Sequence, residues 1–225
     1  MIIAIDGPAG SGKSSTAKVV AARLGFTYLD TGAMYRVITL KSLRNSISAN
    51  DFPALKKLTD STKIAFTGTP PNIKVWMDGE DVTDAIRSDE VTKNVSDYCA
   101  PAVVREALVD QQRAIAGNTN VVCDGRDIGT VVFRNAELKF FMIASVEERA
   151  RRRQIDFEKL GVIKSIDELI KDLEIRDHKD STRANSPLCK AAGAEEIDTT
   201  RLTFDQQVEH IVYKAKAYSE KTYEY

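Results

Sequence analysis

The stretch MIIAIDGPAGSGKSS, residues 1–15, joins a short apolar run to a glycine-rich loop. From Gly7 the loop fits the pattern G-x-x-x-x-G-K-[ST] through Ser14. Glycines let successive backbone N–H groups surround a phosphate, and the following helix directs the positive end of its dipole at the same anion. In this pattern the lysine, here Lys13, reaches the β- and γ-phosphates, and the serine hydroxyl ligates Mg²⁺. The stretch therefore predicts a site for a nucleoside triphosphate, most simply ATP.

The residues around the loop fit the same interpretation. Ile2–Asp6 is typical of a short buried strand, and apolar residues recur with helical spacing from Ala17 to Leu24, before Gly25. A chance glycine-rich turn is the alternative, and the strand–loop–helix context speaks against it. We expect ATP to contact nine consecutive residues: Gly7, Pro8, Ala9, Gly10, Ser11, Gly12, Lys13, Ser14 and Ser15.

The composition limits the possible partners. The 225 residues include 32 Lys and Arg against 33 Asp and Glu, so the net charge of −1 gives no general attraction to nucleic acid or to an anionic membrane. The three cysteines are far apart and lack metal-ligand spacing, which favours reduced thiols. No stretch has the length and apolarity of a membrane span, and the strand at the start leaves no room for a signal peptide. We therefore expect a cytoplasmic protein.

Strand-like and helical patterns alternate along the chain. This alternation predicts an α/β fold with a five-stranded parallel sheet and helices on both faces. Ligands of such sheets bind beyond the carboxyl ends of the strands, so Asp6, Asp30 and Asp124 are expected at one rim with the loop. The expected strands are Ile2–Asp6, Phe26–Asp30, Asn120–Asp124, Leu138–Ile143 and Glu195–Asp198.

Two segments depart from this alternation. Residues 62–84 read as small antiparallel strands, with turns at 69–72 and at 78–79, and a helix pair follows, interrupted by Pro101. This indicates either a small lobe covering a site or a plain structural extension. Residues 146–183 are helical and highly charged, and their run SVEERARRRQ is most simply a solvated helix face. Ser165 and Glu168 form a capping box at the start of the second helix.

The end of this second helix carries three charged residues on one face. Arg176, Asp180 and Arg183 stand at i, i+4 and i+7. They fit either a surface salt-bridge ladder, which stabilises little, or an arm that folds over bound phosphates and a sugar.

Arginines in three further stretches distinguish among nucleotide-using proteins. DTGAMYR (30–36), VREAL (104–108) and CDGRDIGTVVF (123–133) supply Arg36, Arg105 and Arg126. The base-reading N-K-x-D motif of switch GTPases does not occur in the sequence. A second anion-binding set beside a phosphate loop is typical of a kinase that brings two phosphorylated ligands together.

The chain resembles the bacterial cytidylate kinases, P-loop enzymes that transfer the γ-phosphoryl group of ATP to CMP or dCMP. The resemblance runs from Ile2 to about Lys214, and it rests on IDGPAGSGKSS, LDTGAMYR, IRSDEV, VREAL, DGRDIGTVVF, RDHKDSTR and DTTRLTFDQQV. It implies a P-loop three-layer sandwich with an inserted antiparallel α+β lobe that binds the nucleoside monophosphate (NMP) and a helical lid. The implied core comprises residues 1–60, 118–150 and 184–225, the lobe 61–117 and the lid 151–183.

The resemblance also implies roles for individual residues. Arg36 and Arg126 would hold the phosphate of CMP. Ser96, Arg105 and Asp127 would read the cytosine edge. Arg176 and Asp180 would contact the sugar, and Arg183 would approach the phosphates from the lid. The implied catalytic residues are Lys13, Arg126 and Arg183, with Ser14 on Mg²⁺. The implied CMP contacts are Thr31, Tyr35, Arg36, Ser96, Arg105, Arg126, Asp127, Arg176, Asp180 and Arg183.

Two positions depart from the family pattern. Thr31 stands where the family often has Ser, and its extra methyl group could crowd the CMP phosphate. Lys179 stands where an arginine is common, and lysine offers a point charge without the bidentate fork.

The expected partners are ATP, CMP and dCMP, with neither nucleic acid nor membrane, and a monomer is expected. Two alternatives stay open at this point: a P-loop kinase for another acceptor such as UMP, and a catalytically weak nucleotide-binding regulator. A regulator could lose Lys13, Ser14, Arg126 and Arg183, and all four are present.

Overall fold

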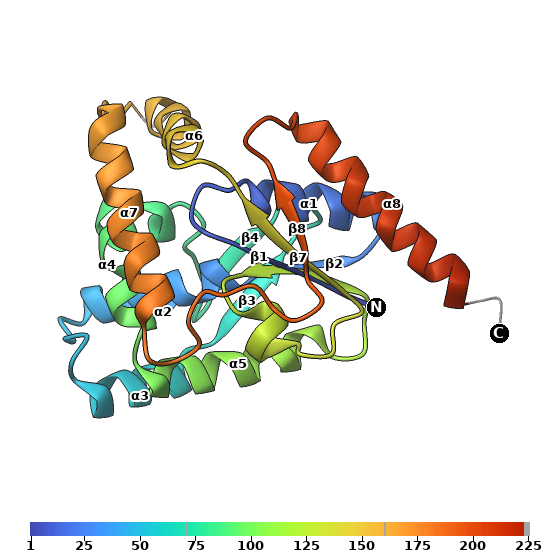
Figure 1. The fold of residues 1–225 in the computed structure, drawn as a ribbon. Coiled ribbons are helices and arrows are strands. Elements are labelled where there is room, and N and C mark those ends of the chain that lie inside the picture. Colours follow the sequence, from blue (N-terminus) through green and yellow to red (C-terminus); the bar gives the residue numbers. More distant parts are fainter. Residues whose placement is uncertain (71, 160, 223–225) are drawn as a thin grey trace.

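The computed structural model describes residues 1–70, 72–159 and 161–222. Its main sheet is parallel, with the strand order β2-β6-β1-β7-β8, and Figure 1 shows helices on both sides of it. The five strands are β1 (Ile2–Asp6), β2 (Thr27–Asp30), β6 (Val121–Gly125), β7 (Leu138–Ile143) and β8 (Glu195–Asp198). The expected fold class is confirmed, with the second and third expected strands each beginning one residue later than expected.

Alternation along β1 divides the core into two layers. Ile3 and Ile5 pack with α1 (Lys13–Leu24) and α8 (Phe204–Thr222) on one face. Ala4 faces a second cluster that includes residues of α2 (Thr31–Arg44), α3 (Phe52–Ser61) and α5 (Ala102–Ala116). Because successive strand side chains point to opposite faces, a strand this apolar needs a helical layer on each side. The result is a three-layer sandwich.

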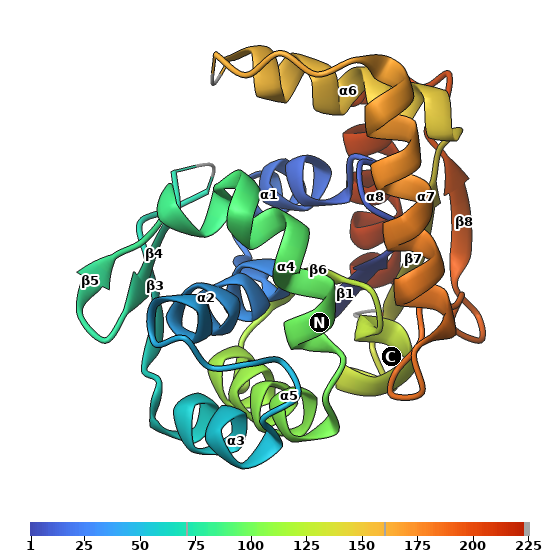
Figure 2. The ribbon, with the colours of Figure 1, turned by 90° about the vertical axis from the view of Figure 1, so that its left-hand side faces the viewer.

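The segment after α3 forms the expected antiparallel sheet. Its strands are β3 (Ile64–Thr67), β4 (Lys74–Met77) and β5 (Glu80–Asp81), and the turn expected at 69–72 includes residue 71, which lies outside the described residues. Val75, Met77 and Ile86 pack against Val37 of α2, so the small sheet has its own cluster. Figure 2 shows it beside α2 and α4 (Asp89–Cys99). The short 3₁₀ turn Ala85–Arg87 leads into α4.

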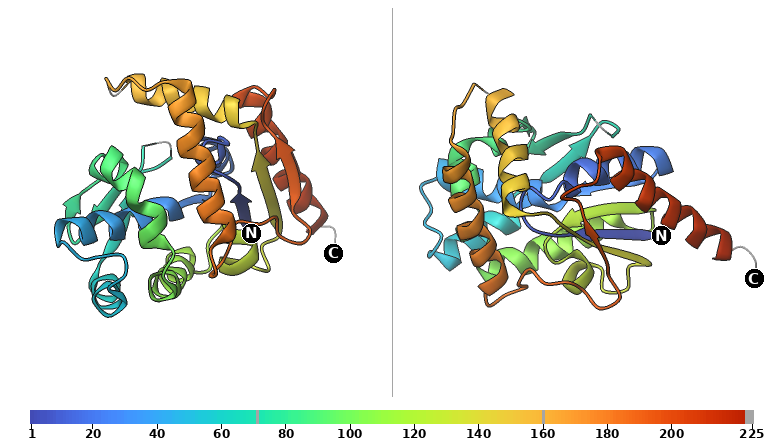
Figure 3. Two further views of the ribbon diagram at one scale, coloured as in Figure 1. Left: turned by 60° about the vertical axis from the view of Figure 1, so that its left-hand side comes forward. Right: turned by 45° about the horizontal axis from the view of Figure 1, so that its top comes forward.

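The charged segment forms a helical hairpin. α6 (Val146–Lys159) and α7 (Ile166–Thr182) lie side by side. In both views of Figure 3, α7 runs across the side of the molecule where the strands of the main sheet have their carboxyl ends. The capping box is confirmed, because Ser165 and Glu168 each bond the backbone of the other. The helix ends at Thr182, so Arg183 follows it in an extended conformation. In the described part of the chain, no helix is long and apolar enough to cross a membrane.

Candidate active site

A cavity of about 200 Å³ opens beyond the carboxyl ends of β1, β2 and β6. Strand ends, the loop after β1 and the helices α2, α4, α5, α6 and α7 all contribute to its wall. The cavity brings together Lys13, Ser14, Thr31, Tyr35, Arg36, Ser96, Arg105, Arg126, Asp127, Arg176, Asp180 and Arg183. All ten residues expected to contact an acceptor therefore share one cavity with the lysine and serine of the phosphate loop.

The backbone of the phosphate loop has the conformations that glycine permits. Gly7 has φ +152°, and a Cβ there would lie 2.1 Å from the carbonyl oxygen of Met142. Gly12, at φ +89°, precedes the first residue of α1, which is Lys13 itself. The Lys13 ammonium donates to the carbonyl oxygen of Pro8 at 2.9 Å. Burial, and next the nearby Arg126, lower the pKa of Lys13 well below its usual value, so a bound anion would stabilise its charged form.

A second cavity lies on the other side of the loop. It has a volume of about 630 Å³, and Lys13, Ser14 and Arg153 line it as well as the first cavity. Its remaining wall includes Lys18, Arg152 and the start of α8. The phosphate loop thus stands between two spaces, which is the arrangement that transfer between two bound ligands requires.

Asp124 lies at the end of β6, beside the loop. Its Oδ2 accepts from the Ser14 hydroxyl at 2.5 Å, its Oδ1 accepts from the Tyr28 hydroxyl at 2.7 Å, and its carbonyl oxygen accepts from Thr31 at 2.7 Å. Burial, together with Asp30, raises the pKa of Asp124 to about 6. The sequence analysis placed Asp124 at this rim but gave it no role. Its position at a strand end, facing the serine of the loop, is the signal that could have done so.

Asp6 is one of the three acids expected at the rim, and its side chain points elsewhere. It accepts from the backbone N–H groups of Ile128 and Gly129, both at 2.8 Å, and it does not line the cavity. Asp30 does line the cavity, and it also caps α2 through the N–H of Ala33. All three acids stand at one edge of the sheet, as expected, but Asp6 serves two buried N–H groups in the segment after β6, which need acceptors.

Cationic side chains crowd the middle of the cavity. Arg36 donates to the carbonyl oxygen of Ile86 and to Thr92 Oγ1, the latter at 2.8 Å. Burial, then the charge of Arg153, lower the pKa of Arg36 to about 10. Burial, then Arg126 and Arg36, lower the pKa of Arg176 to about 9. So many mutually repelling cations, lining a single cavity, point to an anionic ligand.

The far end of the cavity holds a buried ion pair. Arg105 Nη2 donates to Asp127 Oδ2 at 2.5 Å, and both side chains are 4 % exposed. Arg105 also donates to the carbonyl oxygen of Cys99 at 3.2 Å, and its guanidinium lies over the Tyr35 ring. Arg105 Nε and the Tyr35 hydroxyl are buried without a hydrogen-bond partner among the described residues. These groups can recognise a polar planar ligand edge.

Arg183 lies at this end of the cavity. Its guanidinium is 4.0 Å from Asp127 and 3.8 Å from Asp180, and its Nε donates to the carbonyl oxygen of Ser186. The sequence analysis placed Arg183 near the phosphates, yet in the structure it neighbours Arg105 and Asp127. The α7 residues whose charges act on the pKa of Lys13 are Arg176, which lowers it, and Asp180, which raises it. The position of Arg183 follows from the end of α7 at Thr182, after which the chain turns away.

Asp180 joins the two regions of the cavity. It accepts from Arg126 Nε at 2.9 Å. Burial raises the pKa of Asp180, but Arg126, Arg176 and Arg183 outweigh it and hold the pKa below its usual value. Asp180 is therefore ionised, buried and surrounded by arginines.

The arginine run of α6 is not simply a solvated face. Arg149 is buried, Arg152 donates to Thr199, and Arg153 lines both cavities, whereas Arg151 is exposed. Arg153 had no expected role at the site, and neither had Arg87, which also lines both cavities. The sequence signal for Arg153 was its position in that run. A helix exposes some side chains of such a run and buries the others.

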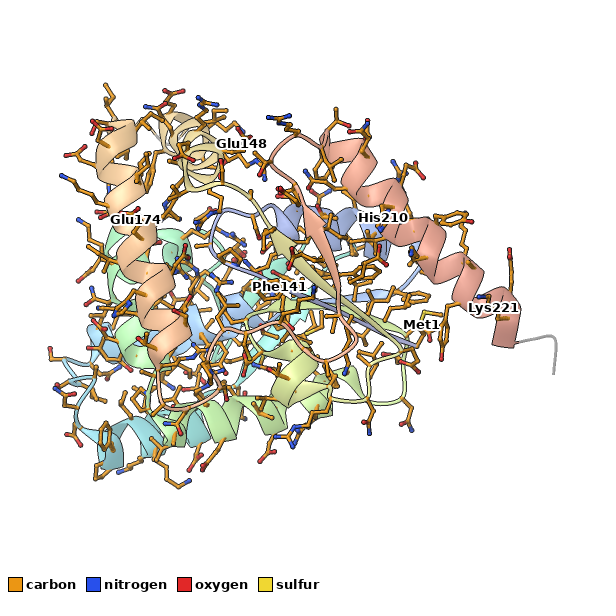
Figure 4. All side chains as sticks on the ribbon, in the orientation of Figure 1. Met1, Phe141, Glu148, Glu174, His210 and Lys221 are labelled. Atoms are coloured by element: carbon orange, nitrogen blue, oxygen red, sulfur yellow. The ribbon has the colours of Figure 1, made fainter. Side chains whose placement is uncertain are left out.

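The two histidines lie outside the cavity. His178 is exposed on α7. His210, labelled on α8 in Figure 4, contacts Glu195 at 2.6 Å and packs edge-on against Phe140. Lys179 does not line this cavity, and it pairs with Asp97 of α4 at 2.7 Å.

The phosphate loop follows the first strand of a parallel sheet, with an arginine-lined cavity on one side and a second cavity on the other. This arrangement defines the class of P-loop phosphotransferases that bind two ligands. A family model described as Cytidylate kinase matches residues 3–217. The chain accordingly belongs to the cytidylate kinase family.

Relatives named Cytidylate kinase are similar over nearly the whole chain. The protein of Pediococcus pentosaceus is 49% identical over 210 residues, covering 93% of each chain. That of Lysinibacillus sphaericus is 49% identical over 214 residues, covering 95% of this chain and 96% of its own. The crystal structure of an uncharacterized protein from Eubacterium ventriosum shares the fold, with a TM-score of 0.51 and 14% identity over 95% of this chain and 97% of that one.

Proposed function

We propose that this protein transfers the γ-phosphoryl group of ATP to CMP and dCMP, forming ADP and CDP or dCDP. The observation that carries the proposal is the buried Arg105–Asp127 pair, which lines the same arginine-rich cavity as Lys13. Membership of the cytidylate kinase family and the names of the relatives support it. ATP occupies the loop Gly7–Ser15 and the cavity of about 630 Å³, and CMP occupies the cavity of about 200 Å³.

Transfer requires positioning and charge neutralisation rather than a strong base, because the acceptor is already an anionic phosphate. Arg36 and Arg126 orient that phosphate toward Lys13. Negative charge that spreads over the transferring group is met by Lys13, Arg126 and Arg176, and by Arg153 from the border of the two cavities. The loop faces both ligands, so the phosphoryl group passes directly from one to the other.

The residues beside the loop fit Mg²⁺. Among the described residues no group of three or more His, Cys, Asp and Glu could hold a metal by itself. Mg²⁺ is commonly held by one or two protein oxygens together with nucleotide phosphates, and the adjacent oxygens of Ser14 and Asp124 meet that need. Bound there, Mg²⁺ would neutralise charge on the β- and γ-phosphates.

Cytosine is recognised by the polarity of the Arg105–Asp127 pair. Cytosine presents an amino donor beside acceptors, and uracil places a carbonyl where that donor stands. Asp127 accepts and Arg105 donates, while Ser96 can do either. A buried site of this polarity rejects uracil because its own polar groups are left without partners. We assign Arg183 to this end as well, where it supports Asp127, since its guanidinium lies 4.0 Å from that carboxylate.

Recognition of the sugar is assigned to α7. Asp180 accepts from the ribose 2′-OH, and Arg176 lies between the sugar and the phosphate. Thr31 and Tyr35 complete the wall of the cavity. We propose the core, lobe and lid with the limits expected from the sequence, except that α5 serves the core too: its Val104 and Leu108 share the cluster of the main sheet. A monomeric state and a cytoplasmic location stay predictions.

The test compares Asp127→Asn with the unchanged protein on CMP and UMP. Loss of a hydrogen bond to a charged group costs about 1.5–3 kcal/mol, so kcat/KM for CMP should fall roughly ten- to hundredfold while that for UMP changes little. The ratio of the two kcat/KM values is the quantity to measure, because a loss of folded enzyme cancels in it. An equal decline for both substrates would show that Asp127 shapes the loop and does not read the base.

The two alternatives are not favoured. A kinase for UMP would need the reverse polarity at the end of the cavity, where Asp127 offers acceptors. A regulator without catalysis would not need four arginines between its two ligands.

A further inference from the structure

The α6–α7 hairpin packs directly on the tip of the phosphate loop. Ala9 belongs to the same hydrophobic cluster as Ala150 and Phe157 of α6 and Leu169 and Leu173 of α7. A Cβ built on Gly10 would lie 3.0 Å from Arg149 Cβ and 3.2 Å from its carbonyl oxygen. Because no gap separates them, a shift of the loop tip must be accommodated by the hairpin.

Arg149 connects this loop to α7. Its side chain is 8 % exposed, and its Nε donates to the carbonyl oxygen of Ala144 at 3.1 Å. One nitrogen, Nη1, donates both to the carbonyl oxygen of Ala9, at 3.1 Å, and to Asp177 Oδ2, at 2.6 Å. A single guanidinium therefore holds a loop peptide and a carboxylate of α7 in fixed relation.

Asp177 stands between the two residues of α7 that line the acceptor cavity. Arg176 precedes it, and Asp180 follows one helical turn later. Its second oxygen, Oδ1, is buried without a hydrogen-bond partner among the described residues. A partly buried carboxylate with one unpaired oxygen depends strongly on its remaining partner, which is Arg149.

We propose that Arg149 and Asp177 are positioning residues that couple occupancy of the phosphate loop to the acceptor contacts of α7. Neither residue lines either cavity, so both act through their neighbours. A triphosphate bound by the loop N–H groups fixes the Ala9 peptide, and this peptide in turn fixes Arg149. Through Asp177, Arg149 then fixes the segment of α7 that carries Arg176 and Asp180. CMP then binds to a helix that is already ordered, and the coupling is reciprocal. The inference rests on the assignment of donor and acceptor made above.

The experiment measures the dissociation constant of CMP by calorimetry, with and without saturating magnesium and a non-hydrolysable ATP analogue. For the unchanged protein we expect the analogue to tighten CMP binding about tenfold, within the usual range of such couplings. In Asp177→Asn the side chain keeps its shape and loses its charge, and the factor should fall below about threefold. CMP binding without the analogue should change less than about twofold, because Asp177 does not touch the cavity.

Arg149→Lys provides a second variant if Asp177→Asn folds poorly. Lysine keeps the charge but cannot hold the loop carbonyl and Asp177 together, so the same loss of coupling is expected. Asp97→Asn is the matched control, since it removes a carboxylate that pairs with α7 through Lys179, on the exposed side. It should retain the coupling of the unchanged protein.

The outcomes separate this inference from the proposed function. It is overturned if the unchanged protein shows no coupling, if both variants retain it, or if Asp97→Asn loses it equally. If CMP does not bind at all, or binds no better than UMP, the proposed function fails instead.

Discussion

Asp124 illustrates how single residues prepare this site. Hydroxyl groups from three different elements fix it: Ser14 of α1, Tyr28 of β2 and Thr31 of α2. The Tyr28 bond occupies Oδ1, which leaves Oδ2 facing the loop serine. A carboxylate held in this way needs little rearrangement to accept a metal ion or a water molecule.

Removing the Tyr28 hydroxyl should therefore weaken catalysis at limiting Mg²⁺. In Tyr28→Phe, Asp124 Oδ1 loses its donor, and we expect kcat/KM at limiting Mg²⁺ to fall roughly tenfold or more, the usual scale for a bond to a charged group. The measurement is kcat/KM across a Mg²⁺ titration, with calorimetric binding of Mg²⁺ and ADP beside it. Tyr98→Phe is the control, because its hydroxyl donates at 2.7 Å to the carbonyl oxygen of Ile47, away from the loop. Equal behaviour of the two variants would contradict the role of Tyr28.

At the scale of elements, Asp6 joins the end of β1 to the segment after β6. Asp127 occupies the N-cap position of that segment, Ile128–Val132, so the position of the carboxylate proposed to read the base depends on it. Burial raises the pKa of Asp6 from 3.8 to about 6, although the N–H groups of Gly129 and Ile128 counteract part of the shift. The ionised carboxylate is therefore held against a desolvation cost.

This shift predicts a dependence of stability on pH. Between pH 3.8 and about 6 the folded protein holds the Asp6 proton and the unfolded chain does not, so the free energy of unfolding decreases as the pH rises. Protonated Asp6 contributes about 3 kcal/mol to the free energy of unfolding. This contribution is lost as the pH rises from 3.8 to about 6, and it is absent at higher pH. Urea unfolding at pH 4 and at pH 7 gives the free energy of unfolding of the unchanged protein and of Asp6→Asn. The difference between the two proteins should change from one pH to the other by about this contribution. A difference that is the same at both values would contradict the prediction.

At the scale of the whole molecule, the acceptor cavity is where separate parts of the chain meet. Residues of α2, α4, α5, β6 and α7 line it, and the exposed ion pair Lys179–Asp97 also joins α7 to α4. A ligand that contacts all these parts holds them together. It should therefore stabilise the molecule as a unit.

Binding of CMP should raise the melting temperature accordingly. At a concentration of 100 times its dissociation constant, a ligand stabilises by about 2.7 kcal/mol. For a chain of this size that corresponds to roughly 5–10 °C. UMP at the same concentration should produce a much smaller shift, since the Arg105–Asp127 pair opposes it. Thermal unfolding with each nucleotide measures this, and equal shifts would remove cytosine specificity from the proposal.

Features that depend on local patterns can be read from the amino-acid sequence without the fold. The phosphate loop, the strand–helix alternation, the capping box at Ser165 and the small antiparallel sheet all follow from spacing and turn chemistry, and the structure confirms them. The motifs also supplied the residues expected to contact the acceptor, which line one cavity in the structure, and their contacts with a nucleotide stay predictions. Short-range signals suffice for such features because they act within a few residues.

The directions of individual side chains within those motifs follow from long-range packing instead. Asp6 turns to two backbone N–H groups, Arg183 lies beside Asp127, and Arg153 enters both cavities from what reads as a solvated run. Arg149 reaches Ala9, 140 residues away in sequence. These directions depend on which buried donors, acceptors and charges meet after packing. A buried polar group that finds no partner is costly, so each side chain turns to a partner that the fold brings near, and sequence spacing does not reveal that partner.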